Sequence, residues 1–336
     1  MIYPRKLKLN DSIGIVAVSN GANPDKINYS IENLKKIGFN VLETKNTRNS
    51  NQFVSTDGNT RAQEFMSLWQ DEKIACIISA RGGEFLMEMI PYLHSYKNDI
   101  LKYNTKWVQG FSDTSLLLFY LTTNYNIATI HASNLSEFAM RELDISLKNN
   151  LNFLKEESIE FVQNNYEKYQ LEEIDDDNQA EYNLTEYVKY KSIGNMKNIN
   201  FSGRLIGGCI DAITVLLGTN YDNTARFCNQ FDEGVIWYID NYGLDLLELR
   251  RKLWQMKEAG WFNNIKGFMF GRSYRHAKIG DFSFEDCIEK SLGDLNVPII
   301  YDVDIGHVPP QLTIINGAFA KVEYNNGKAT IIQELK

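Results

Sequence analysis

The sequence predicts an α/β protein with an N-terminal lobe built on a parallel sheet and a smaller C-terminal α/β lobe rich in strands. In the first lobe, short runs that are apolar throughout alternate with amphipathic helical segments. This alternation is typical of a parallel sheet covered by helices on both faces. Near the C-terminus, two alternating segments flank Asn326-Gly327, and Asn-Gly is a strong β-hairpin signal.

The first 135 residues contain the elements of the parallel sheet in order. Pro24 opens the first helix, because proline is tolerated in the first helical turn, and Thr60 is a candidate cap for the second. Ligands of parallel sheets bind outside the C-terminal ends of the strands, where this sequence places its polar turns. Strands are expected at residues 13–18, 41–42, 74–80, 107–110 and 127–130, and a further helix at 116–121.

The second half of the chain predicts another set of helices and strands. Residues 207–218 are interpreted as a helix packed on glycines, and residues 244–254 as a second helix. Further strands are expected at 235–239, 267–271, 297–301, 318–322 and 328–332.

Three segments follow from this pattern: an N-terminal lobe at 1–150, a linker or insertion at 151–200, and a C-terminal lobe at 201–336. The middle segment has few aliphatic residues and two readings remain open. It is either a solvated linker or insertion, or a loop whose tyrosines close over a ligand. The tyrosines concerned are Tyr166, Tyr169, Tyr182, Tyr187 and Tyr190.

Composition excludes several classes of protein. With 35 Lys and Arg against 43 Asp and Glu, the net charge of −8 argues against a nucleic-acid partner. The apolar runs are far shorter than the roughly 20 residues that a membrane-spanning helix needs, and the N-terminus does not read as a signal peptide. Four cysteines without a CxxC pair predict neither a zinc site nor a disulfide framework. A cytoplasmic protein without metal or cofactor and without a membrane partner is therefore expected.

Ser112 lies in Gly110-Phe111-Ser112-Asp113, at a turn from a strand into a helix. A serine at this place is presented at the sheet edge, with free helix N–H groups behind it that can stabilise an oxyanion. The arrangement is like a nucleophile elbow, although Thr114 replaces the last glycine of G-x-S-x-G. The alternative is that Ser112 simply caps the helix.

A serine nucleophile needs a base, and the chain has four histidines, His94, His131, His276 and His307. His307 has the most favourable context, because Gly306 precedes it, two prolines follow Val308, and the turn comes directly after a predicted strand. This context would hold the imidazole at a loop tip.

Two further strand ends carry polar groups. Asp240 ends the strand at 235–239 and could orient the base, or it could cap the next helix. Arg81, Gly82 and Gly83 follow the strand at 74–80. The glycines allow a backbone to approach a ligand closely, and Arg81 could bind a carboxylate of the substrate through two hydrogen bonds.

Together these segments resemble the LD-carboxypeptidase family of serine peptidases, which includes the microcin C self-immunity peptidases. The resemblance follows the chain in order through residues 9–17, 57–61, 80–83, 110–114, 203–208 and 306–307. It implies an N-terminal lobe similar to a class I glutamine amidotransferase domain, a C-terminal strand-rich lobe, and a homodimer.

The resemblance also implies site residues. Ser112 matches the nucleophile and His307 the general base, and the amides of Gly83 and Asp113 match the oxyanion hole. Asp240 stands where the family normally has glutamate. Because aspartate is one methylene shorter, its carboxylate is expected to fall about 1.5 Å short of the imidazole unless the backbone shifts. Cys209 is a second departure, since the family commonly has asparagine there.

The implied substrate is a small peptidyl or aminoacyl-nucleotide molecule. In length and in its 151–200 insertion, the chain resembles the microcin C immunity branch, which releases a terminal aspartate from a modified adenylate. Because no tryptophan lies between 107 and 237, only a tyrosine such as Tyr166, Tyr182 or Tyr187 could stack on the base. The alternatives are a carboxypeptidase that removes D-alanine from murein tetrapeptides, and a weakly active or inactive binder of peptidyl ligands.

Overall fold

The computed structural model describes residues 1–172 and 178–336, and its first sheet confirms the predicted parallel lobe. The strand order is β14-β5-β4-β3-β1-β2. All neighbouring pairs are parallel except β14, which joins the edge from the C-terminal part of the chain and runs antiparallel to β5. The strands are β1 (Ser12–Val16), β2 (Asn40–Glu43), β3 (Ile74–Ser79), β4 (Trp107–Gly110), β5 (Thr129–His131) and β14 (Ile314–Asn316).

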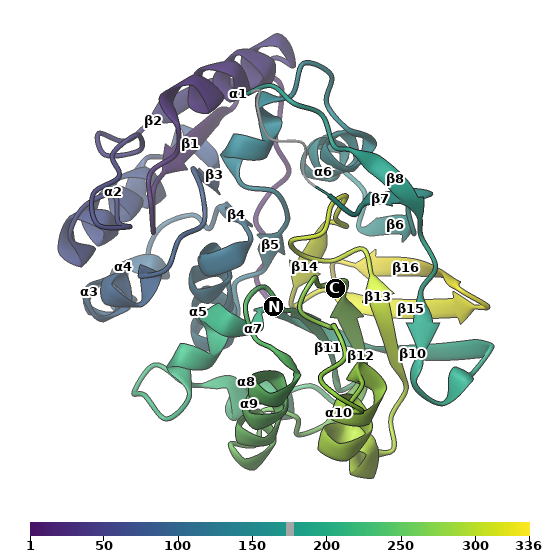
Figure 1. Ribbon diagram of the computed structural model, residues 1–336. Helices are drawn as coiled ribbons and strands as arrows, with labels where there is room; N and C mark the ends of the chain where they lie inside the picture. The colour runs from purple at the N-terminus through teal and green to yellow at the C-terminus, as the bar shows by residue number, and fades with distance from the viewer. Residues whose placement is uncertain (173–177) are drawn as a thin grey trace.

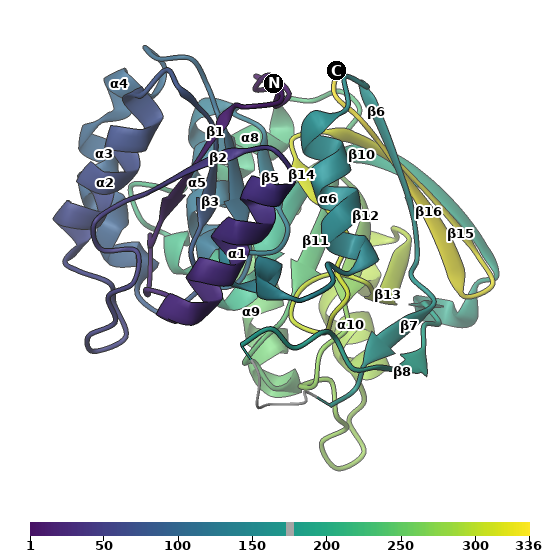
Figure 2. The same ribbon diagram turned by 90° about the horizontal axis from the view of Figure 1, so that it is seen from above.

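Helices cover both faces of this sheet, as the apolar strands require (Figure 2). On one face, α1 (Pro24–Lys36) and α6 (Ile145–Lys155) contribute Ile27, Leu34 and Leu151 to a buried cluster. The helices α2 (Gly58–Gln70), α3 (Ile90–Ser95) and α5 (Ser115–Tyr125) contribute to a second cluster, and the short α4 (Lys97–Ile100) follows α3.

The second sheet is larger and mixed, with the order β6-β16-β15-β10-β11-β12-β13-β9. Its centre, β10 to β13, is parallel, and the β15–β16 hairpin predicted around Asn326-Gly327 pairs antiparallel with β10. The strands are β6 (Glu160–Asn164), β9 (Lys191–Ser192), β10 (Asn198–Cys209), β11 (Val235–Asp240), β12 (Ile265–Gly271), β13 (Ile299–Val303), β15 (Phe319–Asn325) and β16 (Lys328–Glu334).

Helix α5 joins the two sheets, because residues 115–123 are all buried. Phe119 contacts the second lobe, with ring centroids 5.8 Å from Trp237 and 5.2 Å from Trp261. A helix that is apolar on every side must be enclosed by protein. The remaining helices of the second lobe are α7 (Ile210–Ile213), α8 (Thr224–Asn229), α9 (Leu246–Glu258) and α10 (Phe284–Leu292).

Two local predictions are wrong. Residues 207–218 do not form one helix: β10 continues through Gly207 and Gly208, and the helix α7 has four residues. A Cβ on Gly207 would lie 1.8 Å from the carbonyl oxygen of Tyr238, so Gly207 marks the close approach of β10 and β11. The cap of α2 is Asp57, whose side chain accepts from the amide of Thr60 at 3.0 Å.

The segment at 151–200 contains more regular structure than a linker. It contributes β6 and β9 to the second sheet, and β7 (Lys168–Gln170) pairs with β8 (Leu184–Tyr187) in a separate hairpin. The proposed boundary at 150 falls within α6. Part of the acidic run of this segment, residues 175–177, lies outside the described residues.

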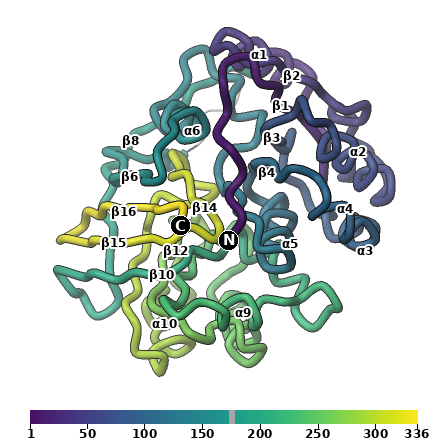
Figure 3. Tube along the Cα trace, turned by 180° about the vertical axis from the view of Figure 1, so that it is seen from behind, coloured from purple at the N-terminus to yellow at the C-terminus, as the bar shows by residue number. Residues whose placement is uncertain are grey.

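The two chain ends lie next to each other (Figure 3). The carbonyl of Lys336 accepts hydrogen bonds from the Tyr3 hydroxyl at 2.9 Å and the Arg204 guanidinium at 2.6 Å. Within the described part of the chain, each helix is too short or too polar to cross a membrane.

Candidate active site

Ser112 occupies a strained turn between β4 and α5. Its φ is +61°, in the left-handed region that a residue with a side chain rarely adopts. A 3-10 turn at Ser112–Thr114 leads directly into α5, and neither helix start has a side-chain cap. Ser112 is therefore not the helix cap that the sequence left open. A strained serine at the end of a strand and the start of a helix is the geometry of a nucleophile elbow.

The loop containing Gly82 packs directly on Ser112. A Cβ on Gly82 would lie 2.7 Å from the Cβ and 2.8 Å from the Oγ of Ser112, and 3.6 Å from the amide nitrogen of Asp113. The structure thus brings Gly82, Ser112 and Asp113 together. The side chain of Arg81, in contrast, points to solvent.

The carboxylate of Asp113 fixes the loops around the turn. Its Oδ2 accepts from the Ser19 hydroxyl at 2.5 Å and from the amide of Leu86 at 2.8 Å. Burial raises the pKa of Asp113, and these two hydrogen bonds and the charge of Arg61 partly offset that effect. The side chain therefore holds the loops after β1 and β3 against the start of α5.

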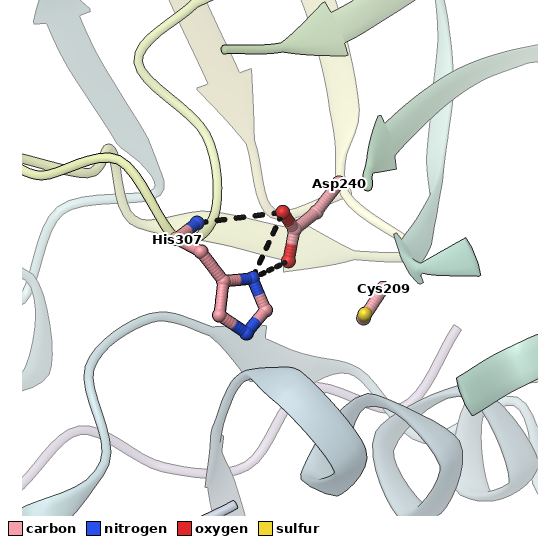
Figure 4. Close-up of side chains that lie close together, drawn as sticks. All are labelled: Cys209, Asp240 and His307. Atoms are coloured by element: carbon pink, nitrogen blue, oxygen red, sulfur yellow. Dashed lines mark hydrogen bonds and ion pairs between the residues drawn. The ribbon is translucent and has the colours of Figure 1, made fainter. Parts of the chain in front are cut away.

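Asp240 and His307 form a buried hydrogen-bonded pair at the end of β11 (Figure 4). The Nδ1 atom of His307 lies 3.1 Å from Oδ1 and 2.9 Å from Oδ2 of Asp240. The Asp240 side chain is fully buried and that of His307 is 15% exposed. A carboxylate at Nδ1 fixes the orientation of the ring and leaves Nε2 for a proton transfer.

The shortfall of about 1.5 Å, expected unless the backbone shifts, is not seen, because the backbone of the His307 loop approaches the carboxylate. Gly306 has a φ of +88°, and a Cβ on it would lie 1.9 Å from Oδ1 of Asp240. The amide nitrogen of His307 also lies 3.4 Å from that oxygen. The glycine therefore leaves the space in which the Asp240 carboxylate approaches the His307 loop.

Two aromatic rings enclose the imidazole. Phe111, the neighbour of Ser112, has its ring centroid 5.0 Å from that of His307, and Tyr242 lies 4.4 Å away on a different element. Burial lowers the pKa of His307, but the charge and hydrogen bond of Asp240, together with the charges of Asp211 and Glu137, outweigh burial, so that its pKa is raised overall. Sequence reasoning missed Tyr242, although its position two residues after Asp240 placed it at the same sheet edge.

The loop that carries His307 is anchored by a second buried acid, Asp304. Its Oδ2 accepts from the Tyr190 hydroxyl at 2.6 Å and from the amide of Tyr166 at 2.8 Å, and its Oδ1 pairs with Arg272. The tyrosines belong to the 151–200 segment. That segment thus positions the loop of His307.

A cavity of about 350 Å³ opens beside the imidazole. Tyr182 lines it together with Phe111 and His307. Of the other two tyrosines expected to stack on a base, Tyr166 is half-buried under the His307 loop and Tyr187 lies at hollows elsewhere on the surface. Of these three tyrosines, Tyr182 is the one that lines the cavity beside His307.

The other histidines have different surroundings. His94 is hydrogen-bonded to the Tyr120 hydroxyl at 2.8 Å, and His276 stacks on Phe284 with centroids 4.1 Å apart. His131 is fully buried behind Phe111, and burial lowers its pKa to about 4. His131 is therefore neutral near pH 7, and because its side chain is buried it is not exposed to a ligand.

The family of the chain follows from comparison of its sequence with known proteins. Residues 13–132 match the N-terminal domain of LD-carboxypeptidases and residues 202–322 match their C-terminal domain. The chain belongs to the LD-carboxypeptidase family. The N-terminal match contains Ser112, and the C-terminal match contains Asp240 and His307. Each residue thus lies in the lobe to which the sequence assigned it.

Relatives in this family carry two kinds of name. A probable murein peptide carboxypeptidase of Bacillus subtilis is 22% identical over 98% of this chain and 94% of its own length. The microcin C7 self-immunity protein MccF of Escherichia coli is 23% identical over 98% of this chain and 95% of its own.

Solved structures of MccF and of an MccF-like protein share the whole fold. An MccF-like protein from Bacillus anthracis superimposes with a TM-score of 0.84 at 21% identity, covering 99% of both chains. MccF in complex with aspartyl sulfamoyl adenosine also has a TM-score of 0.84 at 21% identity, covering 100% of this chain and 99% of its own. The two-lobed fold is thereby confirmed, whereas the likeness of the first lobe to a glutamine amidotransferase domain stays a prediction.

Cys209 lies beside the pair of Asp240 and His307. Among the described residues, these three offer ligand atoms within 4.8 Å of one another (Figure 4). Burial, together with the charges of Asp240 and Asp211, raises the pKa of the Cys209 thiol well above its ordinary value. Cys209 is therefore a neutral thiol near pH 7 and a poor nucleophile.

Replacing Gly306 by alanine tests the close contact with Asp240. The added methyl group would collide with the carboxylate, in addition to the strain of a positive φ, so we expect a loss of about 1–3 kcal/mol of unfolding free energy beyond the strain itself. Gly218→Ala is the matched control, because Gly218 has a φ of +75° and open space around it. Urea unfolding of both variants measures the difference, and equal destabilisation would contradict the contact.

Proposed function

We propose that the protein is a serine-type amide hydrolase in which Ser112 is the nucleophile, His307 the general base and Asp240 the acid that orients it. The hydrogen bond between Asp240 and His307 beside the elbow of Ser112 carries this proposal. Nε2 of His307 is buried and, among the described residues, has no hydrogen-bond partner. It is thus available to take a proton from a hydroxyl group.

The reaction proceeds in two halves. Nε2 of His307 takes the proton of Ser112 as Oγ bonds to the amide carbon, and the amides of Gly83 and Asp113 stabilise the negative oxygen. The imidazolium then gives its proton to the leaving nitrogen and the C–N bond breaks. Water attacks the acyl-enzyme with His307 again as base, which releases the acid and restores Ser112.

For the substrate, we favour an aminoacyl-nucleotide in which the acyl group is joined through nitrogen to a modified phosphate. Relatives support this choice: MccF structures hold aspartyl sulfamoyl adenosine and glutamyl sulfamoyl guanosine. Tyr182 at the cavity supplies an aromatic face for a base, and Gly82 allows the substrate to approach Ser112. Arg81, at the exposed end of the same loop, is the candidate to bind an anionic group of the substrate.

A second candidate is removal of D-alanine from murein tetrapeptides. The Bacillus subtilis relative named as a probable murein peptide carboxypeptidase favours it. Both activities use the same residues, and both fit a cytoplasmic homodimer that needs no cofactor, as the sequence predicts. The remaining alternative is a weakly active or inactive binder of the same ligands.

Product analysis of the wild type and Ser112→Ala tests the reaction. Each protein is offered a murein tetrapeptide and aspartyl sulfamoyl adenosine separately, and released amino acids are detected by mass spectrometry. We expect aspartate release by the wild type and a loss of turnover of the order of 10⁴-fold or more in Ser112→Ala.

Ser115→Ala is the control, because Ser115 lies in the same helix start and its buried hydroxyl has no partner among the described residues. Release of D-alanine in place of aspartate would select murein recycling. Normal turnover by Ser112→Ala would refute the proposed nucleophile.

The acid limb of the pH profile reports His307. A base must be neutral to act, and the pKa of His307 is raised, so kcat/KM falls about tenfold per pH unit below a pKa that lies above the usual value near 6.5. In Asp240→Asn, the largest charge that opposes the effect of burial is removed, so the acid limb moves to lower pH while kcat falls on the order of 10⁴-fold. An acid limb that does not move would show that another group is titrating.

Asp240→Glu separates a tuned site from a decayed one. The carboxylate fills a fully buried space against Gly306, so an extra methylene displaces His307, and we expect kcat to fall at least about tenfold. Asp281→Glu provides the same change at an exposed position. A large gain in rate on Asp240→Glu would favour the weakly active binder.

A further inference from the structure

The cavity beside His307 contains a carboxylate that the proposed reaction does not use. Glu137 lies in the 3-10 turn Leu135–Ala139 that follows β5, and it lines the same cavity as His307 and Tyr182. Its charge is close enough to raise the pKa of His307. An acid that shares a cavity with His307 can contact a ligand bound there.

The turn that presents Glu137 is held rigidly by α1. The Ser30 hydroxyl donates to the carbonyl of Leu135 at 2.8 Å, and the Asn33 amide donates to the carbonyls of Phe138 and Met140 at 2.9 and 2.8 Å. These bonds lie on both sides of Glu137. Its carboxylate is therefore placed before any ligand arrives, which lowers the entropic cost of binding.

One oxygen of this carboxylate has no partner. Oε1 accepts from the Ser136 hydroxyl at 3.0 Å, whereas Oε2 is buried and, among the described residues, accepts no hydrogen bond. Buried acceptors of this kind destabilise a protein unless a donor reaches them. Burial raises the pKa of Glu137 to about 7, although the nearby Lys26 acts in the opposite direction. A cationic donor from a ligand would both satisfy Oε2 and favour the ionised form.

We propose that Glu137 binds a primary ammonium group on the acyl part of the substrate, and that the enzyme selects acyl groups with a free amine. This inference rests on the proposed function, and it concerns the α-ammonium group that an aminoacyl substrate carries beside its scissile carbonyl. A carboxylate accepts hydrogen bonds and an ammonium donates three, so the two groups are complementary. An amine blocked by acetylation would lose its charge and leave Oε2 without its partner.

A binding cycle tests the contact without turnover. Ser112→Ala is titrated by calorimetry with aspartyl sulfamoyl adenosine and with its N-acetyl derivative, and both titrations are repeated after adding Glu137→Gln. We expect acetylation and Glu137→Gln each to weaken binding by about 10- to 100-fold. The two changes together should weaken it no more than either alone, because they remove the same contact.

Glu181→Gln is the matched control, because Glu181 lines the same cavity but is exposed. Removing its charge should alter binding less than threefold. The inference would be overturned if acetylation and Glu137→Gln weakened binding additively, or if Glu137→Gln left binding unchanged. Either result would leave the proposed function standing. If neither this probe nor a murein tetrapeptide with a free amine binds Ser112→Ala, the proposed function and the inference both fail.

Discussion

The enclosure of α5 is the constraint on which the rest of the structure depends. Because this helix is apolar on every side, it is stable only when both sheets close around it. Its first turn then lies where the lobes meet, and Phe111, the neighbour of Ser112 in the first lobe, has its ring centroid 5.0 Å from that of His307 in the second. Gly208 shows how close the approach is, since a Cβ there would lie 2.8 Å from the Cβ of Ser115. The packing of the core thus assembles the candidate site.

The acid–base pair depends on a backbone contact as much as on its side chains. Asp240 reaches His307 because Gly306 leaves no Cβ between them, so the acid and the preceding glycine form one functional unit. This contact explains how the short side chain of an aspartate reaches the imidazole at this position. It also leaves the carboxylate enclosed, and a buried charge beside an imidazole holds the ring in one orientation.

Three further acids, Asp113, Asp304 and Glu137, lie around the candidate site and differ in what they bind. Asp113 ties the loops of the first lobe to the elbow, and Asp304 ties the His307 loop to tyrosines of the 151–200 segment. Both are buried and hydrogen-bonded, and both act through backbone position. Glu137 differs from them, because it has an unsatisfied oxygen at the cavity. Rigid support combined with one open acceptor is the arrangement expected of a preorganised binding site.

The sequence by itself determined the two-lobed fold and the strands marked by long apolar or alternating runs, because such runs fix buried strands and strand ends fix the polar turns. It did not predict β6 to β10 or β14, and it offered Ser112, Asp240 and His307 as candidates at the strand ends. It misassigned residues 207–218, since glycines that serve a close strand contact read the same as glycines in a packed helix. Only the tertiary structure decided that Asp240 reaches His307 and that Glu137 faces the cavity. Those distances arise between residues far apart in the chain, and a local sequence pattern does not tell how far apart such residues lie in space.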